Sequence, residues 1–440
     1  MTFTRISNEL PGPIARAMIA RDAKVISPSY PREYPFVMSH GRGCEVWDVD
    51  GNRFLDFAAG IAVCSTGHAH PKVVEAVKNA ADQFLHISSD YWHENMIALA
   101  ERLAKHAPMK PAMSFLCQSG TEAVEGAIKL ARYVTGRPRF IGFLGGFHGR
   151  TMGSLSFTSS KYTQQKGFAP SMPGVTHVPY PNPYRPLFAG NDQGLAVLDY
   201  IRMLFERNVP ASEVAAILVE PIQGEGGYLV PPESFLPGLR ALCDQHGILL
   251  IFDEVQSGVG RTGKMFACEH WGVEPDIITS AKGLGSGLPI GAVIAKQSIM
   301  SQWQRGAHGN TYGGNPITCA AASATLDLVD SEYAANAEKV GGYFIEQLRM
   351  LQTEFACIGE IRGKGLMIGM ELIENDADRT PARKLCDAII ERAYHNGLLL
   401  LSCGVSTVRF MPPLCVTTKD IDDAMLRIRA SLIEALHEVA

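Results

Sequence analysis

Two segments that each lead to a charged residue constrain the fold of this chain more than any other feature. The first is an unbroken apolar run from Ile248 to Phe252 that ends at Asp253, and the second, Ile277-Ile-Thr-Ser-Ala, leads to Lys282. Apolar residues without alternation are typical of strands buried on both faces, as in a parallel sheet. Ligands of such sheets bind at the carboxyl ends of the strands. We therefore expect an α/β fold in which Asp253 and Lys282 meet at a ligand site.

This pair of residues indicates one kind of chemistry. A buried carboxylate needs a cationic partner, and the small residues Ala281 and Gly283 leave room for a large, flat ligand beside Lys282. A lysine in such a place can lose its proton and form a Schiff base. Pyridoxal 5′-phosphate pairs a Schiff-base lysine with an acid at its pyridine nitrogen. The two strand ends therefore predict this cofactor.

A glycine-rich segment after the first strand offers a competing interpretation. Gly258, Gly260 and Gly263 have the spacing of a dinucleotide-binding loop. Gly258, Gly263 and Lys264 also match most of the pattern of a phosphate-binding loop. Four residues separate Asp253 from the first glycine, however, and Met265 stands where a phosphate loop has Ser or Thr. We expect a structural loop here and keep a nucleotide-binding protein as an alternative.

Composition and charge exclude several classes of protein. With 440 residues, 46% of them apolar, the chain can bury a large core and is expected to form one large and one smaller lobe. A net charge of −5 argues against a nucleic-acid or anionic-membrane surface. There is no secretory signal, no membrane-spanning stretch and no Cys-x-x-Cys pair among the ten cysteines. His68 and His70 have no further ligand at metal-binding spacing. We expect a soluble, cytoplasmic protein without a metal site.

Two segments place suitable groups at the expected sheet edge. Ser119, Gly120 and Thr121 follow an apolar strand and open a helix, so its free amides form either an ordinary cap or a phosphate site. Phe147 and Arg150 follow the next strand, where an aromatic ring can stack on a ligand and an arginine can hold a carboxylate. A solvated loop arginine is the alternative.

Buried charge indicates a second part of the site. Glu220 and Glu225 follow another apolar strand, and two acids there imply a nearby cation. Arg409 stands inside an apolar strand and needs a carboxylate from protein or ligand, unless it lies on an edge strand and reaches solvent. The loop that contains Ile61 has residues small enough for the close approach of a ligand, and a tight turn under the core is the alternative.

These segments resemble the motifs of class III aminotransferases, and most closely those of 4-aminobutyrate aminotransferases. The motifs are Ser119-Gly-Thr-Glu-Ala, Phe147-His-Gly-Arg-Thr, Glu220-Pro-Ile-Gln-Gly-Glu-Gly-Gly, Asp253-Glu-Val-Gln and Ser280-Ala-Lys-Gly. The resemblance extends from about Tyr34 nearly to the end of the chain. It implies a fold-type I pyridoxal-phosphate-dependent transferase, with a mostly parallel seven-stranded sheet in a large domain and a smaller α/β domain. We expect residues 1–70 to form an N-terminal arm and part of the small domain, 71–334 the large cofactor-binding domain, and 335–440 the C-terminal small domain.

The resemblance also implies roles at the cofactor. Gly120 and Thr121 are implied at the phosphate, with Thr311 reaching it from the neighbouring subunit. Phe147 and Val255 are implied on the two ring faces, Gln256 at the phenolic oxygen and Asp253 at the pyridine nitrogen. Ser119, His148 and Lys282 complete the implied cofactor-binding set. Lys282 is expected to bond the cofactor and to move the substrate proton. A homodimer with shared active sites, or a dimer of such dimers, is therefore implied.

For the substrates, the resemblance implies two arginines. Arg150 is expected to bind the distal carboxylate, and Arg409 the α-carboxylate of glutamate. With an ω-amino acid bound, Arg409 has no substrate carboxylate and is neutralised by Glu225, so this pair is expected to switch between the half-reactions. Ile61 and Glu220 complete the predicted substrate-binding set.

We therefore predict an enzyme that transfers the amino group of an ω-amino acid to 2-oxoglutarate, giving a semialdehyde and glutamate. The donor is expected to be 4-aminobutyrate or a similar compound, with 5-aminovalerate, ornithine and acetylornithine as alternatives. A racemase or epimerase on the same scaffold is the alternative from another reaction class, since Arg409-Phe-Met-Pro-Pro-Leu also resembles that branch. Arg150 favours the aminotransferase.

Overall fold

The computed structural model describes residues 6 and 9–439. Its largest sheet has seven strands in the order β4 (Ala112–Cys117), β10 (Gly291–Lys296), β9 (Ile277–Ser280), β8 (Leu249–Asp253), β7 (Val214–Val219), β5 (Arg139–Phe143) and β6 (Val175–Val178). β10 runs antiparallel to β4 and β9, and the other pairs are parallel. The predicted mostly parallel sheet is thus confirmed.

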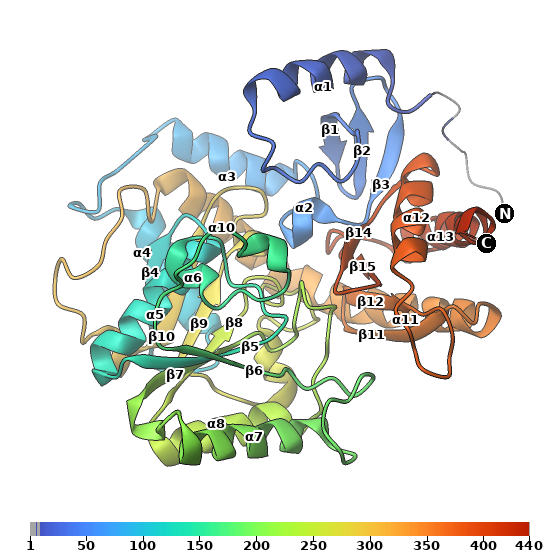
Figure 1. The fold of residues 1–440 in the computed structure, drawn as a ribbon. Coiled ribbons are helices and arrows are strands. Elements are labelled where there is room, and N and C mark those ends of the chain that lie inside the picture. The colour runs from blue at the N-terminus through green and yellow to red at the C-terminus, as the bar shows by residue number, and fades with distance from the viewer. Residues whose placement is uncertain (1–5, 7–8, 440) are drawn as a thin grey trace.

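Helices bury both faces of this sheet (Figure 1). Ala216 and Leu218 of β7 pack in one apolar cluster with α5 (Gly120–Thr135), and Ile217 and Val219 pack in another with α7 (Gln193–Arg207) and α8 (Phe235–His246). Because successive strand residues point to opposite faces, burial of both faces explains why the segment is apolar without alternation.

Two smaller sheets lie beside the large one. The first has the order β1 (Met38–Arg42), β2 (Glu45–Asp48), β3 (Arg53–Asp56) and β13 (Leu398–Leu399), and the second β11 (Ile358–Lys364), β12 (Met367–Leu372), β15 (Thr407–Phe410) and β14 (Leu401–Cys403). Their helices are α11 (Ala334–Glu354), α12 (Arg383–His395) and α13 (Thr418–Val439). Since β3 pairs in parallel with β13, N-terminal and C-terminal segments share one sheet. This pairing supports the proposed domain boundaries at residues 70 and 334, which stay a prediction.

Seven further α-helices among the described residues lie between or beside the three sheets in the chain order. They are α1 (Pro13–Val25), α2 (Ala59–Ala62), α3 (Pro71–Ala81), α4 (Glu94–His106), α6 (Met152–Leu155), α9 (Gln297–Met300) and α10 (Pro316–Leu328). α10 packs against α3 and α4. No helix among the described residues is long and apolar enough to cross a membrane.

Two local expectations need correction. The apolar residues from Leu398 to Leu401 predict one short strand, but the stretch divides into β13 and β14, which belong to different sheets. At the break, the backbone N–H of Leu400 donates to the Tyr34 hydroxyl at 3.0 Å instead of to a strand. The sequence predicts a helix from about Leu195 to Arg207, whereas α7 begins two residues earlier, because the Asp192 side chain caps it by accepting from the Leu195 amide at 3.0 Å.

Candidate active site

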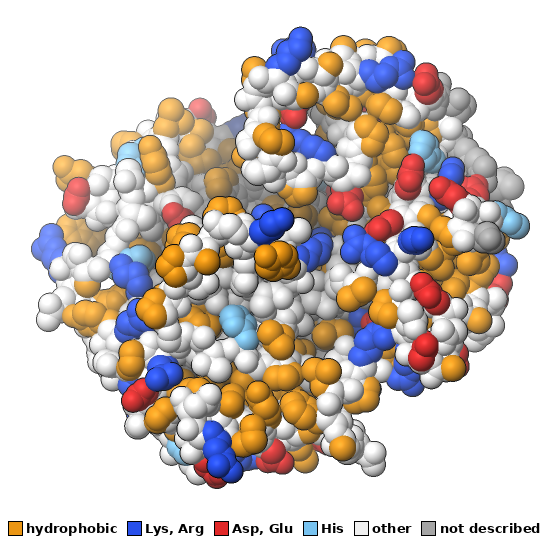
Figure 2. Space-filling view, viewed as in Figure 1, with side chains coloured by type: hydrophobic (Ala, Val, Ile, Leu, Met, Phe, Trp, Pro, Cys, Tyr) orange, Lys and Arg blue, Asp and Glu red, His pale blue; other side chains and the backbone are white. Residues whose placement is uncertain are grey.

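A cavity of about 440 Å³ opens at the carboxyl ends of β8 and β9. Figure 2 shows a hollow in the surface between the lobe that carries β1–β3 and the large domain, with Lys and Arg side chains along its rim. The lining residues come from distant parts of the chain: Val63, Gln118, Ser119, Gly120, Thr121, Phe147, His148, Gly149, Arg150, Glu220, Asp253, Val255, Gln256, Ala281, Lys282, Gly287, Leu288, Pro289 and Ile290. The fold therefore assembles most of the predicted site in one place.

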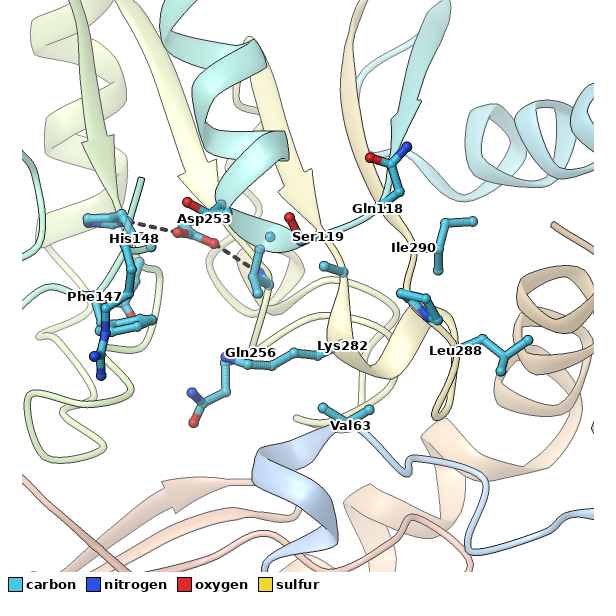
Figure 3. Close-up of a pocket in the computed structure, with 18 of the residues that line it drawn as sticks. Val63, Gln118, Ser119, Phe147, His148, Asp253, Gln256, Lys282, Leu288 and Ile290 are labelled. Carbon is cyan, nitrogen blue, oxygen red and sulfur yellow. Dashed lines mark hydrogen bonds and ion pairs between the residues drawn. The ribbon is translucent and has the colours of Figure 1, made fainter. Parts of the chain in front are cut away.

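Asp253 is held at the end of β8 by three hydrogen bonds. Its Oδ1 accepts from the Val255 amide at 3.0 Å and from the Thr279 hydroxyl at 3.1 Å. Its Oδ2 lies 2.7 Å from Nδ1 of His148 (Figure 3). Burial would lower the pKa of His148, but the bond to Asp253 raises it above its ordinary value. The carboxylate therefore faces the cavity in a fixed orientation, as an acid that pairs with a ring nitrogen requires.

Lys282 follows β9 and extends into the same cavity (Figure 3). Its backbone has φ +41°, a left-handed conformation that side-chain-bearing residues seldom adopt. Burial lowers the pKa of its ammonium group below the ordinary value, opposed by Asp253, Glu225 and Glu220. A lowered pKa favours the neutral amine, which is the nucleophilic form.

The N-terminus of α5 faces the cavity beside these groups. The Ser119 hydroxyl accepts from the Glu122 amide at 3.3 Å, so an ordinary cap is present. The segment is also tightly packed, since a Cβ on Gly120 would lie 2.8 Å from Val255. The Thr121 hydroxyl is bonded to that of Ser154 at 2.6 Å and lines the cavity. The cap is therefore present, and because Gly120 and Thr121 also line the cavity, a phosphate site at this helix N-terminus stays a prediction.

Glu220 is held by backbone amides, and the nearby cation expected for the two acids, Arg409, pairs with Glu225. Oε1 of Glu220 accepts from the Phe147 amide at 3.0 Å and its Oε2 from the Gly224 amide at 2.8 Å. Burial raises its pKa to about 7. No Lys or Arg among the described residues forms an ion pair with Glu220, and the nearby His148 and the two backbone amides oppose the rise in its pKa.

Glu225 and Arg409 form the expected ion pair. Nη1 of Arg409 donates to Oε1 of Glu225, and the two side chains are 5% and 13% exposed. β15 lies between β12 and β14, so the alternative of an edge-strand arginine is wrong. Burial would lower the pKa of Arg409, but Glu225 raises it. The pair does not line the cavity itself, yet it is close enough to Lys282 to affect the pKa of that lysine.

Three residues predicted to belong to the site are exposed, and two of them do not line the cavity. Arg150 is exposed at the cavity, with its guanidinium 5.7 Å from the centre of the Phe147 ring. Ile61 is 42% exposed, and within its loop it is Val63 that lines the cavity. Thr311 is exposed and lies outside the cavity of its own chain. Its predicted role from a neighbouring subunit stays a prediction.

Sequence reasoning missed part of the lining. Leu288, Pro289 and Ile290 line the cavity, although they follow Lys282 in a glycine-rich segment whose sequence predicts only a loop and a strand. Gln118 directly precedes the helix cap and was given no role. These residues lie close in sequence to the predicted motifs at Lys282 and Ser119, and this closeness could have indicated that they line the site.

The glycine-rich segment after β8 has a structural role. The fully buried Arg261 donates to the backbone oxygens of Leu366 and Pro412, the first at 3.2 Å. A Cβ on Gly260 would lie 2.7 Å from Val329. The loop therefore packs against the C-terminal segments and lies outside the cavity, which argues against a nucleotide loop.

Comparison with known proteins shows the family. The chain matches the model of class-III aminotransferases over residues 26–432, and it belongs to this family. It is 40% identical over 440 residues to an alanine/serine racemase of Pyrococcus horikoshii, covering 97% of this chain and 92% of the relative. It is 42% identical over 416 residues to an acetylornithine aminotransferase of Caldanaerobacter subterraneus (93% and 97%) and 40% identical over 412 residues to a 5-aminovalerate aminotransferase of Pseudomonas aeruginosa (93% and 96%).

A solved structure shows the same fold. It is the ornithine aminotransferase of Toxoplasma gondii, with PLP at partial occupancy in its active site, and it matches with a TM-score of 0.85 and 31% identity over 96% of this chain and 95% of that chain. The fold-type I architecture and the resemblance to class III aminotransferases are thereby confirmed. The cofactor is pyridoxal 5′-phosphate, as predicted.

The residues present fit this cofactor. A lysine, an acid and a helix N-terminus converge on one cavity, and the side-chain oxygen of Gln256 is buried there without a hydrogen-bond partner among the described atoms. Lys282 would bond the cofactor, Asp253 would hold its ring nitrogen, and Gly120 and Thr121 would hold its phosphate. Among the described residues, no group of three or more His, Cys, Asp or Glu side chains has the geometry of a metal site.

Proposed function

We propose that this enzyme transfers the amino group of an ω-amino acid, such as 4-aminobutyrate, to 2-oxoglutarate. The observation that carries the proposal is the buried Glu225–Arg409 pair beside the cavity. An enzyme that binds an ω-amino acid and glutamate in turn needs an α-carboxylate site that is filled for one substrate and neutralised for the other. Arg150, exposed at the cavity, is the arginine proposed for the distal carboxylate.

The chain's own groups support the chemistry of transamination. When bound, pyridoxal phosphate accepts the electrons of the substrate carbon that loses its proton. Lys282 takes that proton with its neutral amine and returns it within the same closed site. Asp253, oriented by His148, would favour the protonated form of the ring nitrogen of the bound cofactor. Phe147 and Val255 are proposed to hold the ring between them, with Ile61 and Glu220 near the substrate.

A donor panel tests the proposal. Purified holoenzyme is incubated with 2-oxoglutarate and each of 4-aminobutyrate, 5-aminovalerate, ornithine, acetylornithine and L-alanine, and glutamate formation is followed. We expect the highest kcat/KM with an ω-amino acid that has no α-amino group. A rate confined to ornithine or acetylornithine would assign the donor to that class instead.

A racemase is the second candidate, because a racemase aligns with 97% of this chain at 40% identity. Racemisation needs no amino acceptor, whereas transamination consumes 2-oxoglutarate. Incubating L- and D-alanine without a keto acid and measuring both enantiomers by chiral chromatography separates the two. Appearance of the opposite alanine enantiomer in the absence of a keto acid would favour the racemase.

We also propose a cytoplasmic homodimer, or a dimer of such dimers, with shared active sites. Trp92 is 91% exposed and Tyr91 is 69% exposed, and both line a groove with Phe84. The ring of His86 lies 5.3 Å from that of Tyr312, next to Thr311. Exposed apolar area of this kind is typical of protein interfaces. All ten cysteines are free thiols, which supports a reducing compartment.

A further inference from the structure

The two oxygens of Glu225 face two different cations. Oε1 accepts from Arg409, while Oε2 lies 3.8 Å from Nζ of Lys161. Burial alone would raise the pKa of Glu225, but Arg409 and Lys161 together hold it below the ordinary value. Lys161 is 38% exposed at its side chain, against 5% for Arg409. Glu225 therefore stands between a buried cation and one that reaches solvent.

The backbone around Lys161 is anchored to the loop that carries Phe147. The Ser159 amide donates to the Gly146 backbone oxygen at 2.8 Å, and the Ser159 hydroxyl donates to that of Phe143 at 3.0 Å. These bonds attach the lysine to the strand-end loop of β5, whereas Arg409 belongs to β15. The two cations therefore reach Glu225 from different domains of the proposed division.

Binding of an α-carboxylate by Arg409 creates an electrostatic problem. Glu225 has to release Arg409, and a buried carboxylate without a cation is costly. A small rotation of the Glu225 carboxylate towards Lys161 keeps it paired, because its Oε2 already faces that lysine. The release then exchanges one ion pair for another instead of leaving a charge unpaired.

We propose that Lys161 is a positioning and specificity-determining residue, the alternative counter-ion that holds Glu225 while Arg409 binds the α-carboxylate of the dicarboxylate substrate. The proposal rests on the proposed function, because it assumes that Arg409 alternates between Glu225 and a substrate. It assigns to Lys161 an effect on the glutamate and 2-oxoglutarate half-reaction only. Lys161 acts through Glu225 and does not itself touch the substrate.

Equilibrium binding of unreactive analogues tests this on the holoenzyme. Glutarate has the two carboxylates of 2-oxoglutarate and engages both arginines, whereas butyrate has one and engages Arg150 alone. Calorimetric Kd values are measured for wild type, Lys161→Gln and Glu225→Ala, for the double variant, and for the control Lys166→Gln. Lys166 is an exposed lysine of the same segment without an ion pair among the described residues.

We expect Lys161→Gln to weaken glutarate binding about fivefold, a modest effect because the lysine is partly exposed, and to leave butyrate binding unchanged. Glu225→Ala should tighten glutarate binding, and in that background Lys161→Gln should have no further effect. Lys161→Arg should restore most of the affinity. Lys166→Gln should behave as wild type.

Three results would overturn the proposal. They are no effect of Lys161→Gln on glutarate, an equal effect on glutarate and butyrate, and an effect that persists in Glu225→Ala, which would show a direct contact with the ligand. These readings do not require a particular amino donor. An enzyme that fails to use any ω-amino acid but shows the expected glutarate pattern would refute the proposed function and keep Lys161 as the counter-ion.

Discussion

Removal of Glu225 tests how one cavity serves two kinds of substrate. In Glu225→Ala, Arg409 loses its carboxylate partner while only 5% of its side chain is exposed to solvent. A bound ω-amino acid offers Arg409 no carboxylate in return. Glutamate supplies its α-carboxylate. The penalty therefore falls on one half-reaction.

The expected magnitude follows from the cost of breaking a buried ion pair. Breaking a buried ion pair by removing one partner costs about 3–5 kcal/mol. Part of that cost is already present in the free variant, so we assign about 2 kcal/mol to the complex with the ω-amino donor. Since about 1.4 kcal/mol is tenfold, kcat/KM for 4-aminobutyrate should fall about thirtyfold. The value for glutamate should stay level or rise, because no ion pair has to open.

Single-turnover kinetics separate the half-reactions, with the visible absorbance of the bound cofactor as the signal. Arg409→Ala should show the opposite pattern and slow the glutamate half-reaction more. Glu225→Gln, which keeps the size but not the charge, should behave like Glu225→Ala if charge is the cause. Equal losses in both half-reactions for all three variants would refute the reasoning and show that the pair only supports the site.

Three further predictions concern single residues. Lys282→Ala should bind pyridoxal phosphate noncovalently but not turn over, because the proton-moving group is lost; substantial transamination by this variant would contradict the mechanism. Asp253→Asn should lose most activity in the same assay, since the ring nitrogen is no longer held protonated, and a near-normal rate would mean that another group pairs with it. The hydrogen bond to Asp56 raises the pKa of His68 to about 10, so its stabilisation is complete below about pH 6.5 and is lost as the pH rises towards 10. Urea unfolding at pH 7 and 10 should show a loss of about 2 kcal/mol in wild type and much less in His68→Gln, and equal losses would contradict this.

The sequence was most informative where function and local structure coincide. The apolar segments before Asp253 and Lys282 predicted buried parallel strands, because burial on both faces removes the alternation that exposed sheets show. Their carboxyl ends then had to meet at one edge. The acid, the lysine and the helix that begins at Gly120 were therefore expected together, and the structure places them around one cavity.

Contacts between segments that are far apart in the chain could not be predicted from local sequence patterns. The division of Leu398–Leu401 between two sheets depends on the Tyr34 hydroxyl, 366 residues away in the chain. Lys161 lies in a segment without apolar periodicity, so nothing local indicated that it faces Glu225. An ion pair depends on where two loops meet, and residue order alone does not record that.

Glu220 shows how the backbone sets the geometry between the two proposed carboxylate sites. Its two oxygens bind the amides of Phe147 and Gly224, so one side chain joins the loop that carries Arg150 to the loop that carries Glu225. The two loops are thereby tied together, so the position of Arg150 relative to Glu225, the partner of Arg409, depends on Glu220. Under the proposed function, a donor spans from the carboxylate at Arg150 to the reacting carbon beside Lys282. We therefore expect this link between the loops to influence which donor length the enzyme accepts.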